Sequence, residues 1–335
     1  MKGKAADLAL AADAIFMRRA IEVAWTKRTQ TSPNPWVGAV LVSASGRIFE
    51  AATSPPPGPH AEASVLAAAR EEARGASLYV TLEPCSHFGR TPPCTQAIVA
   101  AGVERVVVGV EDPDPRVSGS GIRALAEAGV SVVVGVEAEA VEAQLAPYLA
   151  HRRRGWPWVV VKLALSLDGH IAAKDGSSRW ITGEEARRDA QLLRAESDAI
   201  VVGANTVRVD NPRLTVRLPG AWRQPLRVVM GRFSDEAAVA PALSWEGPPE
   251  ELLRELGSRG VLQVLVEGGA QVAGEFHAAR LVDRYVFYLA PMLLGGGAIE
   301  AIRGWVAESM EEAWRGRILS VREVGGDLRL EVAPS

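Results

Sequence analysis

The stretch that decides the fold of this 335-residue chain is Thr81-Leu82-Glu83-Pro84-Cys85-Ser86-His87-Phe88-Gly89-Arg90-Thr91-Pro92-Pro93-Cys94, together with His60-Ala61-Glu62 upstream. Helices are expected at 61–74 and 95–101, so His60, Cys85 and Cys94 come together at the starts of two neighbouring helices. One imidazole and two thiolates give three protein ligands, as in a catalytic zinc site whose fourth position holds water. Glu62 follows the histidine by two residues and can pass a proton from that water to a leaving amine.

Two other interpretations of Cys85 and Cys94 stay open, because they are the only cysteines of the chain. They could form a single disulfide bridge, or they could be small buried side chains without a metal. A non-catalytic, zinc-stabilised interaction protein would more often have a closed site with four ligands, and the chain has no third cysteine. The presence of Glu62 favours a hydrolytic zinc site of the deaminase type.

Composition narrows the class of protein. Apolar residues make up 48% of the chain, and 37 Lys and Arg residues against 40 Asp and Glu residues give a net charge of −3. No overall positive field favours a nucleic acid or a membrane surface, and no apolar run is long enough to span a bilayer. The amino terminus has no cleavable signal pattern. We therefore predict a cytoplasmic protein that acts on a small molecule.

Helix and strand patterns divide the chain into two α/β series, expected over residues 1–150 and 156–335. The first series opens with an amphipathic helix at 7–28 and a hairpin at 37–50, and then alternates helices with strands. The basic segment 151–157 is expected to be a solvated linker. The second series has strands expected at 158–165, 199–203, 226–230, 262–266 and 285–289. A capping box is predicted at 182–185, and a long polar loop after residue 203.

The cysteine stretch is similar, nearly residue for residue, to the signature of the bifunctional riboflavin-biosynthesis deaminase-reductase family. Residues 32–38 and 112–115 resemble that family too, and the eight-residue spacer between the cysteines separates the chain from cytidine and tRNA adenosine deaminases. The resemblance implies a cytidine-deaminase-like, three-layer α/β/α amino-terminal domain with Zn²⁺ held by His60, Cys85 and Cys94. It also implies that Asn34 contacts the pyrimidine and that zinc hydroxide replaces its 2-amino group.

The second half resembles the reductase part of the same family, which implies a dihydrofolate-reductase-like α/β domain and NADPH as its cofactor. By this resemblance the residues that line the dinucleotide are Ala164, Trp180, Thr206, Asp210, Gly269, Ala270 and Gln271. Those that hold the ribose phosphate substrate are Ser178, Arg194, Leu214, Arg217 and Glu267. Lys162 and Asp168 are candidates to assist opening of the sugar or to orient it. From the residues alone, Gly268-Gly269 could equally be a tight turn.

These expectations describe an enzyme for two consecutive steps of riboflavin synthesis. It would first deaminate 2,5-diamino-6-(5-phosphoribosylamino)pyrimidin-4-one and then reduce the ribosyl group to ribityl. The alternative is a nucleoside or tRNA base deaminase whose second half is an accessory or weakened reductase-like domain. Ala204, Asn211 and Gly231 depart from the residues usual in the reductase family. The resemblance also implies a homodimer or tetramer.

Overall fold

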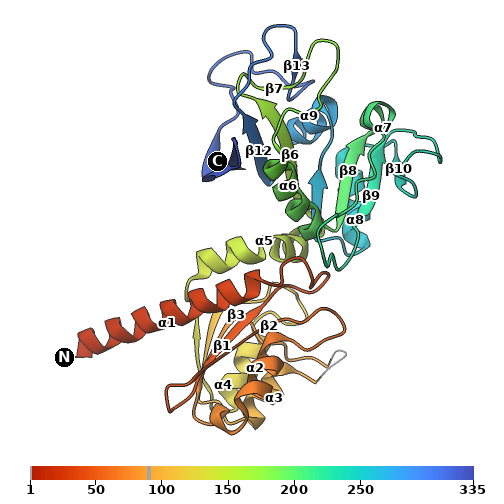
Figure 1. Cartoon of the computed structure of the whole chain (residues 1–335). Helices are drawn as coiled ribbons and strands as arrows, with labels where there is room; N and C mark the ends of the chain where they lie inside the picture. The colour runs from red at the N-terminus through yellow and green to blue at the C-terminus, as the bar shows by residue number, and fades with distance from the viewer. Residues whose placement is uncertain (1, 89–91) are drawn as a thin grey trace. The chain divides into compact units, whose positions relative to one another are not determined.

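The computed structural model describes residues 2–88 and 92–335, with side chains from residue 10 onward. Residues 89–91 of the cysteine stretch therefore lie outside the described residues. The chain divides into two compact units, Met1–Arg154 and Gly155–Ser335, each with its own sheet and helices (Figure 1). Within the described residues, no helix is long and apolar enough to cross a membrane.

The first unit is a sheet with helices on both faces. Its described residues form a five-stranded sheet of order β2-β1-β3-β4-β5, in which β1 is antiparallel to both neighbours and β3, β4 and β5 are parallel. Helices α1 and α5 cover one face, and α2, α3 and α4 cover the other (Figure 1). This confirms the three-layer α/β/α prediction. The bounds are α1 Lys2–Trp25, β1 Gly38–Val42, β2 Ile48–Ala52, α2 Ala61–Ala69, η1 Arg70–Ala73, β3 Ser77–Leu82, α3 Cys94–Ala100, β4 Arg105–Val110, α4 Ser120–Glu127, β5 Ser131–Val134 and α5 Ala138–Arg154.

The second unit is built on a larger sheet. Its described residues form an eight-stranded sheet of order β10-β9-β8-β11-β6-β12-β15-β14, parallel from β10 to β12 and closed by an antiparallel hairpin. A small second sheet pairs β13 with β7. The bounds are β6 Trp158–Ser166, β7 His170–Ala172, α6 Glu184–Glu196, β8 Ala199–Gly203, α7 Ala204–Asp210, β9 Leu226–Met230, β10 Leu243–Trp245, α8 Pro249–Ser258, β11 Gln263–Val266, α9 Ala270–Ala278, β12 Arg284–Ala290, β13 Ile299–Glu300, β14 Gly316–Val324 and β15 Asp327–Pro334.

Alternation along the central strand β6 creates two separate cores. Val159 and Val161 point to the face covered by α8 and α9, whereas Val160 points to the face covered by α6 and α7. All five residues of β8 are buried, as expected for a strand in the middle of a parallel sheet with helices on both faces. The sequences of such strands are short runs of consecutive apolar residues, many of them β-branched. This pattern predicted β8 and β9 at their observed bounds.

The structure departs from the sequence predictions at four places. Helix α5 continues to Arg154, so half of the segment expected to be a linker is helical. Residues 204–210 form α7 instead of a polar loop, because Val207 packs into the core beside β8. The predicted capping box is wrong: Gly183 is the N-cap of α6, and its N–H donates to the Asp327 carboxylate at 2.7 Å. Helix α8 and the hairpin β14–β15 were not predicted.

Candidate active sites

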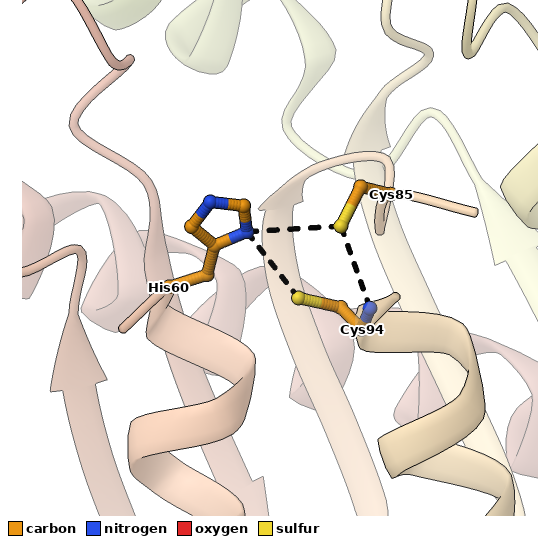
Figure 2. A group of neighbouring side chains, drawn as sticks. All are labelled: His60, Cys85 and Cys94. Carbon is orange, nitrogen blue, oxygen red and sulfur yellow. Dashed lines mark hydrogen bonds between the residues drawn. The ribbon is translucent and has the colours of Figure 1, made fainter. Parts of the chain in front are cut away.

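The three predicted zinc ligands meet at one point of the first unit. His60 is the N-cap of α2, Cys85 lies in the loop after β3, and Cys94 is the first residue of α3. His60 Nδ1 lies 3.7 Å from the Cys85 sulfur and 3.4 Å from the Cys94 sulfur (Figure 2). The Cys94 backbone N–H donates to the Cys85 sulfur at 3.4 Å. The ligand atoms all lie within 4.8 Å of one another.

This donor set fits Zn²⁺ in both spacing and charge. Tetrahedral zinc with sulfur and nitrogen ligands separates neighbouring donor atoms by about 3.5 Å, close to the two distances from His60. The side chain of Cys94 lowers the pKa of Cys85 to about 4, while the same contact raises the pKa of Cys94. Two adjacent thiols without a metal therefore share one negative charge. Two thiolates side by side would repel each other. A bound dication offsets that repulsion and allows both cysteines to be deprotonated.

Glu62 lies in the same cavity as two of the three ligands, His60 and Cys85. The cavity has a volume of about 320 Å³, and its lining includes His60, Glu62 and Cys85 together with Asn34 and His87. The Glu62 side chain is 4% exposed, and burial raises the pKa of its carboxyl group. A carboxyl group with a raised pKa exchanges protons near neutral pH more readily than an exposed one. The cavity therefore brings together two of the metal ligands, Glu62 and the predicted pyrimidine contact Asn34.

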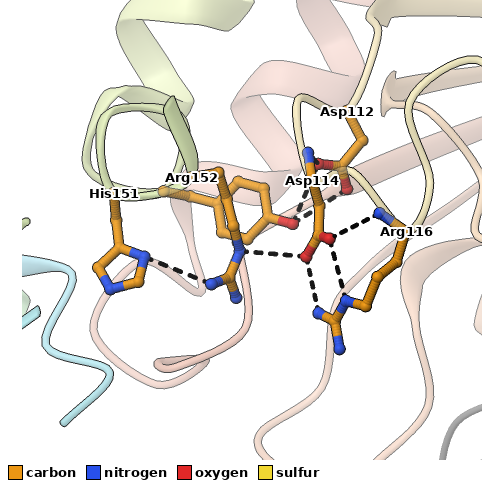
Figure 3. A network of polar contacts seen from close by, with 6 residues as sticks. Asp112, Asp114, Arg116, His151 and Arg152 are labelled. Carbon is orange, nitrogen blue, oxygen red and sulfur yellow. Dashed lines mark hydrogen bonds and ion pairs between the residues drawn. The ribbon is translucent and has the colours of Figure 1, made fainter. Parts of the chain in front are cut away.

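A charged network lines another part of this cavity. Asp114, in the loop after β4, accepts two hydrogen bonds from the Arg116 guanidinium at 2.7 and 3.0 Å. Arg152, in the last turn of α5, places its Nε 3.4 Å from Asp114 (Figure 3). Tyr148 donates to Asp112 at 3.0 Å. The prediction of a solvated linker at 151–157 is wrong for Arg152, because α5 continues through this residue and places it in the cavity wall.

The sequence analysis missed Arg116, Tyr148 and Arg152 as candidates. Arg116 directly follows the family-like 112–115 segment, a signal that could have identified it. Arg152 and Tyr148 lie four residues apart on α5, so they share one face of that helix. Recognising that face required knowing that the helix does not end at residue 149.

The second unit contains a larger cavity of about 960 Å³. It brings together six of the predicted residues, Ser178, Thr206, Asp210, Gly269, Ala270 and Gln271. Glycine backbone forms much of its wall, at positions 203, 231, 247 and 269. Gly269 is the N-cap of α9, and a Cβ there would lie 3.7 Å from Thr206 Oγ1. A glycine-lined cavity of this size at a helix N-terminus fits a dinucleotide cofactor, because its phosphates can approach the backbone N–H groups closely.

Four predicted residues form a charged cluster around Glu267. Arg194 on α6 makes a bidentate pair with Glu267 at 2.6 and 2.8 Å, with side chains only 13% and 10% exposed. Burial opposes ionisation of Glu267, but Arg194, Lys162 and Arg217 outweigh it and lower its pKa. Burial lowers the pKa of Lys162, although the Glu267 carboxylate acts in the opposite direction. Arg194 on α6 therefore faces a buried carboxylate and not solvent.

The other predicted residues of this unit lie apart from that cluster or face elsewhere. Asp168 accepts hydrogen bonds from the Ser166 hydroxyl at 2.5 Å and the Gly295 N–H at 2.7 Å, and these contacts lower its pKa. Leu214 is 3% exposed and belongs to the core beside α6. Trp180 is 67% exposed, with the Arg187 guanidinium 4.4 Å from its ring centroid. Ala164 is half-buried on β6.

Comparison with known proteins gives the same division into two parts. Residues 11–110 match the cytidine and deoxycytidylate deaminase zinc-binding region, and residues 157–328 match the RibD C-terminal domain. The riboflavin biosynthesis protein RibD of Chlamydia trachomatis is 43% identical over 84% of each chain. The RibD protein of Escherichia coli is 36% identical over 96% of this chain and 99% of its own.

Solved structures agree over nearly the full length. Acinetobacter baumannii RibD has a TM-score of 0.90 at 35% identity and covers 98% of this chain and 100% of its own. The Thermotoga maritima diaminohydroxyphosphoribosylaminopyrimidine deaminase/5-amino-6-(5-phosphoribosylamino)uracil reductase has a TM-score of 0.87 at 33% identity, with coverage of 98% and 100%. The chain is therefore a member of the RibD family of riboflavin biosynthesis proteins, the deaminase-reductases whose signature its cysteine stretch resembles.

Proposed function

We propose that the first unit deaminates 2,5-diamino-6-(5-phosphoribosylamino)pyrimidin-4-one and that the second unit reduces the ribosyl group of the product to a ribityl chain with NADPH. Family membership makes the chain a bifunctional enzyme of riboflavin biosynthesis, with a zinc deaminase and a reductase. The alternative, a nucleoside or tRNA base deaminase with an accessory second half, is not favoured, because that half matches a reductase domain over residues 157–328.

The observation that carries the deaminase proposal is the buried Glu62 carboxyl group in the cavity that His60 and Cys85 line, beside the cluster of three metal ligands. His60, Cys85 and Cys94 would hold Zn²⁺, which supplies Lewis-acid activation of water at neutral pH. Glu62 accepts a proton from the attacking water and later donates one to the leaving amino group. The ring carbon gains an oxygen and ammonia leaves, so atoms and charge balance. Asn34 orients the pyrimidine within the cavity.

The reductase proposal rests on the glycine-lined cavity and the Glu267 cluster. Thr206, Asp210 and residues 269–271 would hold NADPH, which supplies a hydride to C1′ of the ribosyl group. Lys162 donates a proton to the sugar oxygen as the ring opens, and burial lowers its pKa in the direction that favours this transfer. Arg194, Arg217 and Glu267 bind and orient the ribose phosphate. The hydrogen bonds of Asp168 to the 294–295 backbone support an orienting role for that residue.

One coupled experiment tests both steps. Purified, zinc-loaded protein is given the diaminopyrimidine substrate and NADPH, and ammonia release and NADPH oxidation are followed together. We expect NADPH oxidation only after deamination begins. Glu62→Gln should lower ammonia release by 10²- to 10⁴-fold, the usual contribution of general acid-base catalysis, with zinc content unchanged. Normal deamination by Glu62→Gln would contradict the mechanism, and supplied deaminated product should still be reduced by this variant.

We further propose that the protein is cytoplasmic and assembles as a homodimer or tetramer. Exposed apolar side chains on the terminal hairpin support assembly, since Ile318 is 62% exposed and Val321 is 58% exposed. Cys85 and Cys94 are both unbridged thiols, which supports a reducing compartment. Light scattering and cell fractionation test these two proposals.

A further inference from the structure

We propose that Tyr288 is a positioning residue of the reductase reaction, whose ring holds the Lys162 ammonium group beside Glu267, where it can donate its proton to the sugar oxygen. The inference deepens the proposed function and rests on it, because Lys162 is the proton donor of the proposed reduction. Tyr288 acts through Lys162 and not by contact with the sugar or the cofactor.

The sheet of the second unit brings these side chains together from three neighbouring strands. Strand β6 lies between β11 and β12, and the three strands are parallel. Val160 of β6 and Val286 of β12 point to the face covered by α6. Side chains alternate along a strand, so Lys162 and Tyr288, each two residues farther on, point to the same face. Since Glu267 follows the end of β11, the lysine lies between a tyrosine ring and a carboxylate.

The tyrosine ring and the ammonium group are close enough to interact directly. The Lys162 nitrogen lies 5.8 Å from the centroid of the Tyr288 ring. A cation within about 6 Å of an aromatic face is attracted to it, and the attraction is stronger where water is excluded. The Tyr288 side chain is buried, and Glu267 and Arg194 also face the ammonium group. Because lysine has a flexible stem, a fixed ring beside it narrows the positions that the ammonium group can take.

The Tyr288 ring is itself fixed by a series of charged contacts. Its hydroxyl donates to Asp189 on α6 at 2.6 Å. Asp189 also accepts a hydrogen bond from Arg322 of β14 at 2.7 Å and lies 3.2 Å from Arg329 of β15. Burial raises the pKa of Tyr288, so its hydroxyl stays protonated and continues to donate. The terminal hairpin therefore holds the carboxylate that orients the ring beside Lys162.

The test separates the ring from its hydroxyl group. Tyr288→Leu removes the ring, whereas Tyr288→Phe keeps the ring and loses the hydrogen bond to Asp189. Tyr285→Leu is the matched control, because Tyr285 is also a buried tyrosine of β12 and its hydroxyl lies 2.7 Å from Nδ1 of His277. The Tyr285 side chain belongs to the core on the opposite face of the sheet. Urea denaturation of the full chain, with ammonia release by the first unit, establishes that each variant is folded.

The assay follows NADPH oxidation with supplied deaminated product, so that the result does not depend on the first unit. We expect kcat to fall about 10- to 100-fold in Tyr288→Leu, because a misplacement of about 1 Å can cost about 100-fold in rate. The KM for NADPH should not change, since the ring does not contact the cofactor. Tyr288→Phe should recover most of the lost activity, and Tyr285→Leu should match the wild type. Equal losses of kcat in the two leucine variants, or no loss in either, would overturn the proposal.

A spectroscopic measurement observes the contact without turnover. The chain has five lysines, at positions 2, 4, 27, 162 and 174, so protein labelled with ¹³C-lysine gives few NMR signals. The Lys162 signal is identified by its loss in Lys162→Met. Protons above the face of an aromatic ring are shifted upfield, so the ε-methylene signal of Lys162 should move downfield in Tyr288→Leu and stay in place in Tyr285→Leu. An unmoved Lys162 signal in Tyr288→Leu would refute the contact.

Lys162→Met also separates this proposal from the proposed function. Loss of reduction in Lys162→Met but not in Tyr288→Leu would refute the positioning role and leave the proposed function standing. Full reduction by Lys162→Met would refute the proton-donor role and the positioning role with it, even where the NMR signal shows that ring and lysine are in contact. Loss of reduction in both variants, with a moved Lys162 signal in Tyr288→Leu, would support the proposal.

Discussion

Glu83→Gln should destabilise the first unit strongly, although Glu83 touches neither metal ligand nor substrate directly in the proposed mechanism. Its buried carboxylate accepts four backbone N–H groups. One oxygen binds Gly121 at 2.8 Å and Ile122 at 3.2 Å, and the other binds Asp112 at 3.1 Å and Gly119 at 3.0 Å. These bonds tie the loop after β3, which carries Cys85, to the loop after β4, which carries Asp114.

The magnitude follows from the number of bonds lost. A glutamine keeps one oxygen but presents an NH₂ group to the other two N–H donors. Two hydrogen bonds to a charged acceptor disappear, each worth about 1.5–3 kcal/mol, so the loss is about 3–6 kcal/mol. That is a large fraction of the stability of an ordinary domain. The cost is high because the donors left behind are buried or part-buried.

Urea denaturation of the full chain measures this effect. Zinc release reports unfolding of the first unit, and NADPH binding reports the second unit as an internal reference. Glu111→Gln is the control, since Glu111 is exposed and accepts a long hydrogen bond of 3.4 Å from the Ser118 hydroxyl. We expect zinc release at a much lower urea concentration in Glu83→Gln only. A midpoint within the error of the wild type would refute the reasoning that the four bonds hold the two loops together.

Three other predictions concern charged groups. Arg194→Met leaves the buried Glu267 carboxylate without its arginine and should lower the free energy of unfolding of the second unit by about 3–5 kcal/mol, measured by urea denaturation. Arg188→Met removes an exposed ion pair and should lower it by less than about 1 kcal/mol. The Arg116 guanidinium lowers the pKa of Asp114 to about 2, below its value of about 3.9 in an unfolded chain. Ionised Asp114 therefore stabilises the fold above about pH 4, and this contribution is lost as the pH falls toward 2. In Arg116→Gln, the free energy of unfolding should fall less steeply with decreasing pH in that window. Chelation of zinc should expose two thiols to a disulfide reagent, and Cys85, with its pKa lowered to about 4, should react first at pH 6. A single reacting thiol would contradict the assignment of both cysteines to one metal.

The zinc ligands could be predicted from the sequence because their positions depend on local features, the ends of neighbouring helices and strands. A histidine at a helix N-cap, a cysteine after a strand and a cysteine at the next helix start are fixed by short spacings. The predicted cofactor residues at 269–271 came from the family resemblance, since Gly268-Gly269 could equally form a tight turn, and the structure places these residues in the glycine-lined cavity. Arg152 could not be predicted, because its position depends on where α5 ends. A basic triplet followed by Gly and Pro resembles a solvated linker until the helix is seen to continue through it.

A similar limit applies to the residues that the family resemblance supplied. Leu214 was transferred as a substrate contact, but its side chain is packed in the core beside α6. Sequence similarity transfers a position and not the direction of a side chain. Arg194 shows the opposite case, since its side chain turns inward to a buried partner, Glu267, which follows the end of β11 and is distant in sequence.

In both units, candidate functional residues follow the carboxyl ends of parallel strands. In the first, Cys85 follows the carboxyl end of β3 and Asp112 follows that of β4, and these strands are parallel. In the second, α7 follows the end of β8 and Glu267 follows the end of β11, again in a parallel pair. Residues that follow the carboxyl ends of parallel strands lie together at one edge of the sheet. In a sequence that alternates strands and helices, such residues can therefore be predicted to share a site. Arg152 reaches the cavity wall from the last turn of α5 and not from a strand end, which explains why the zinc ligands could be predicted from the sequence and Arg152 could not.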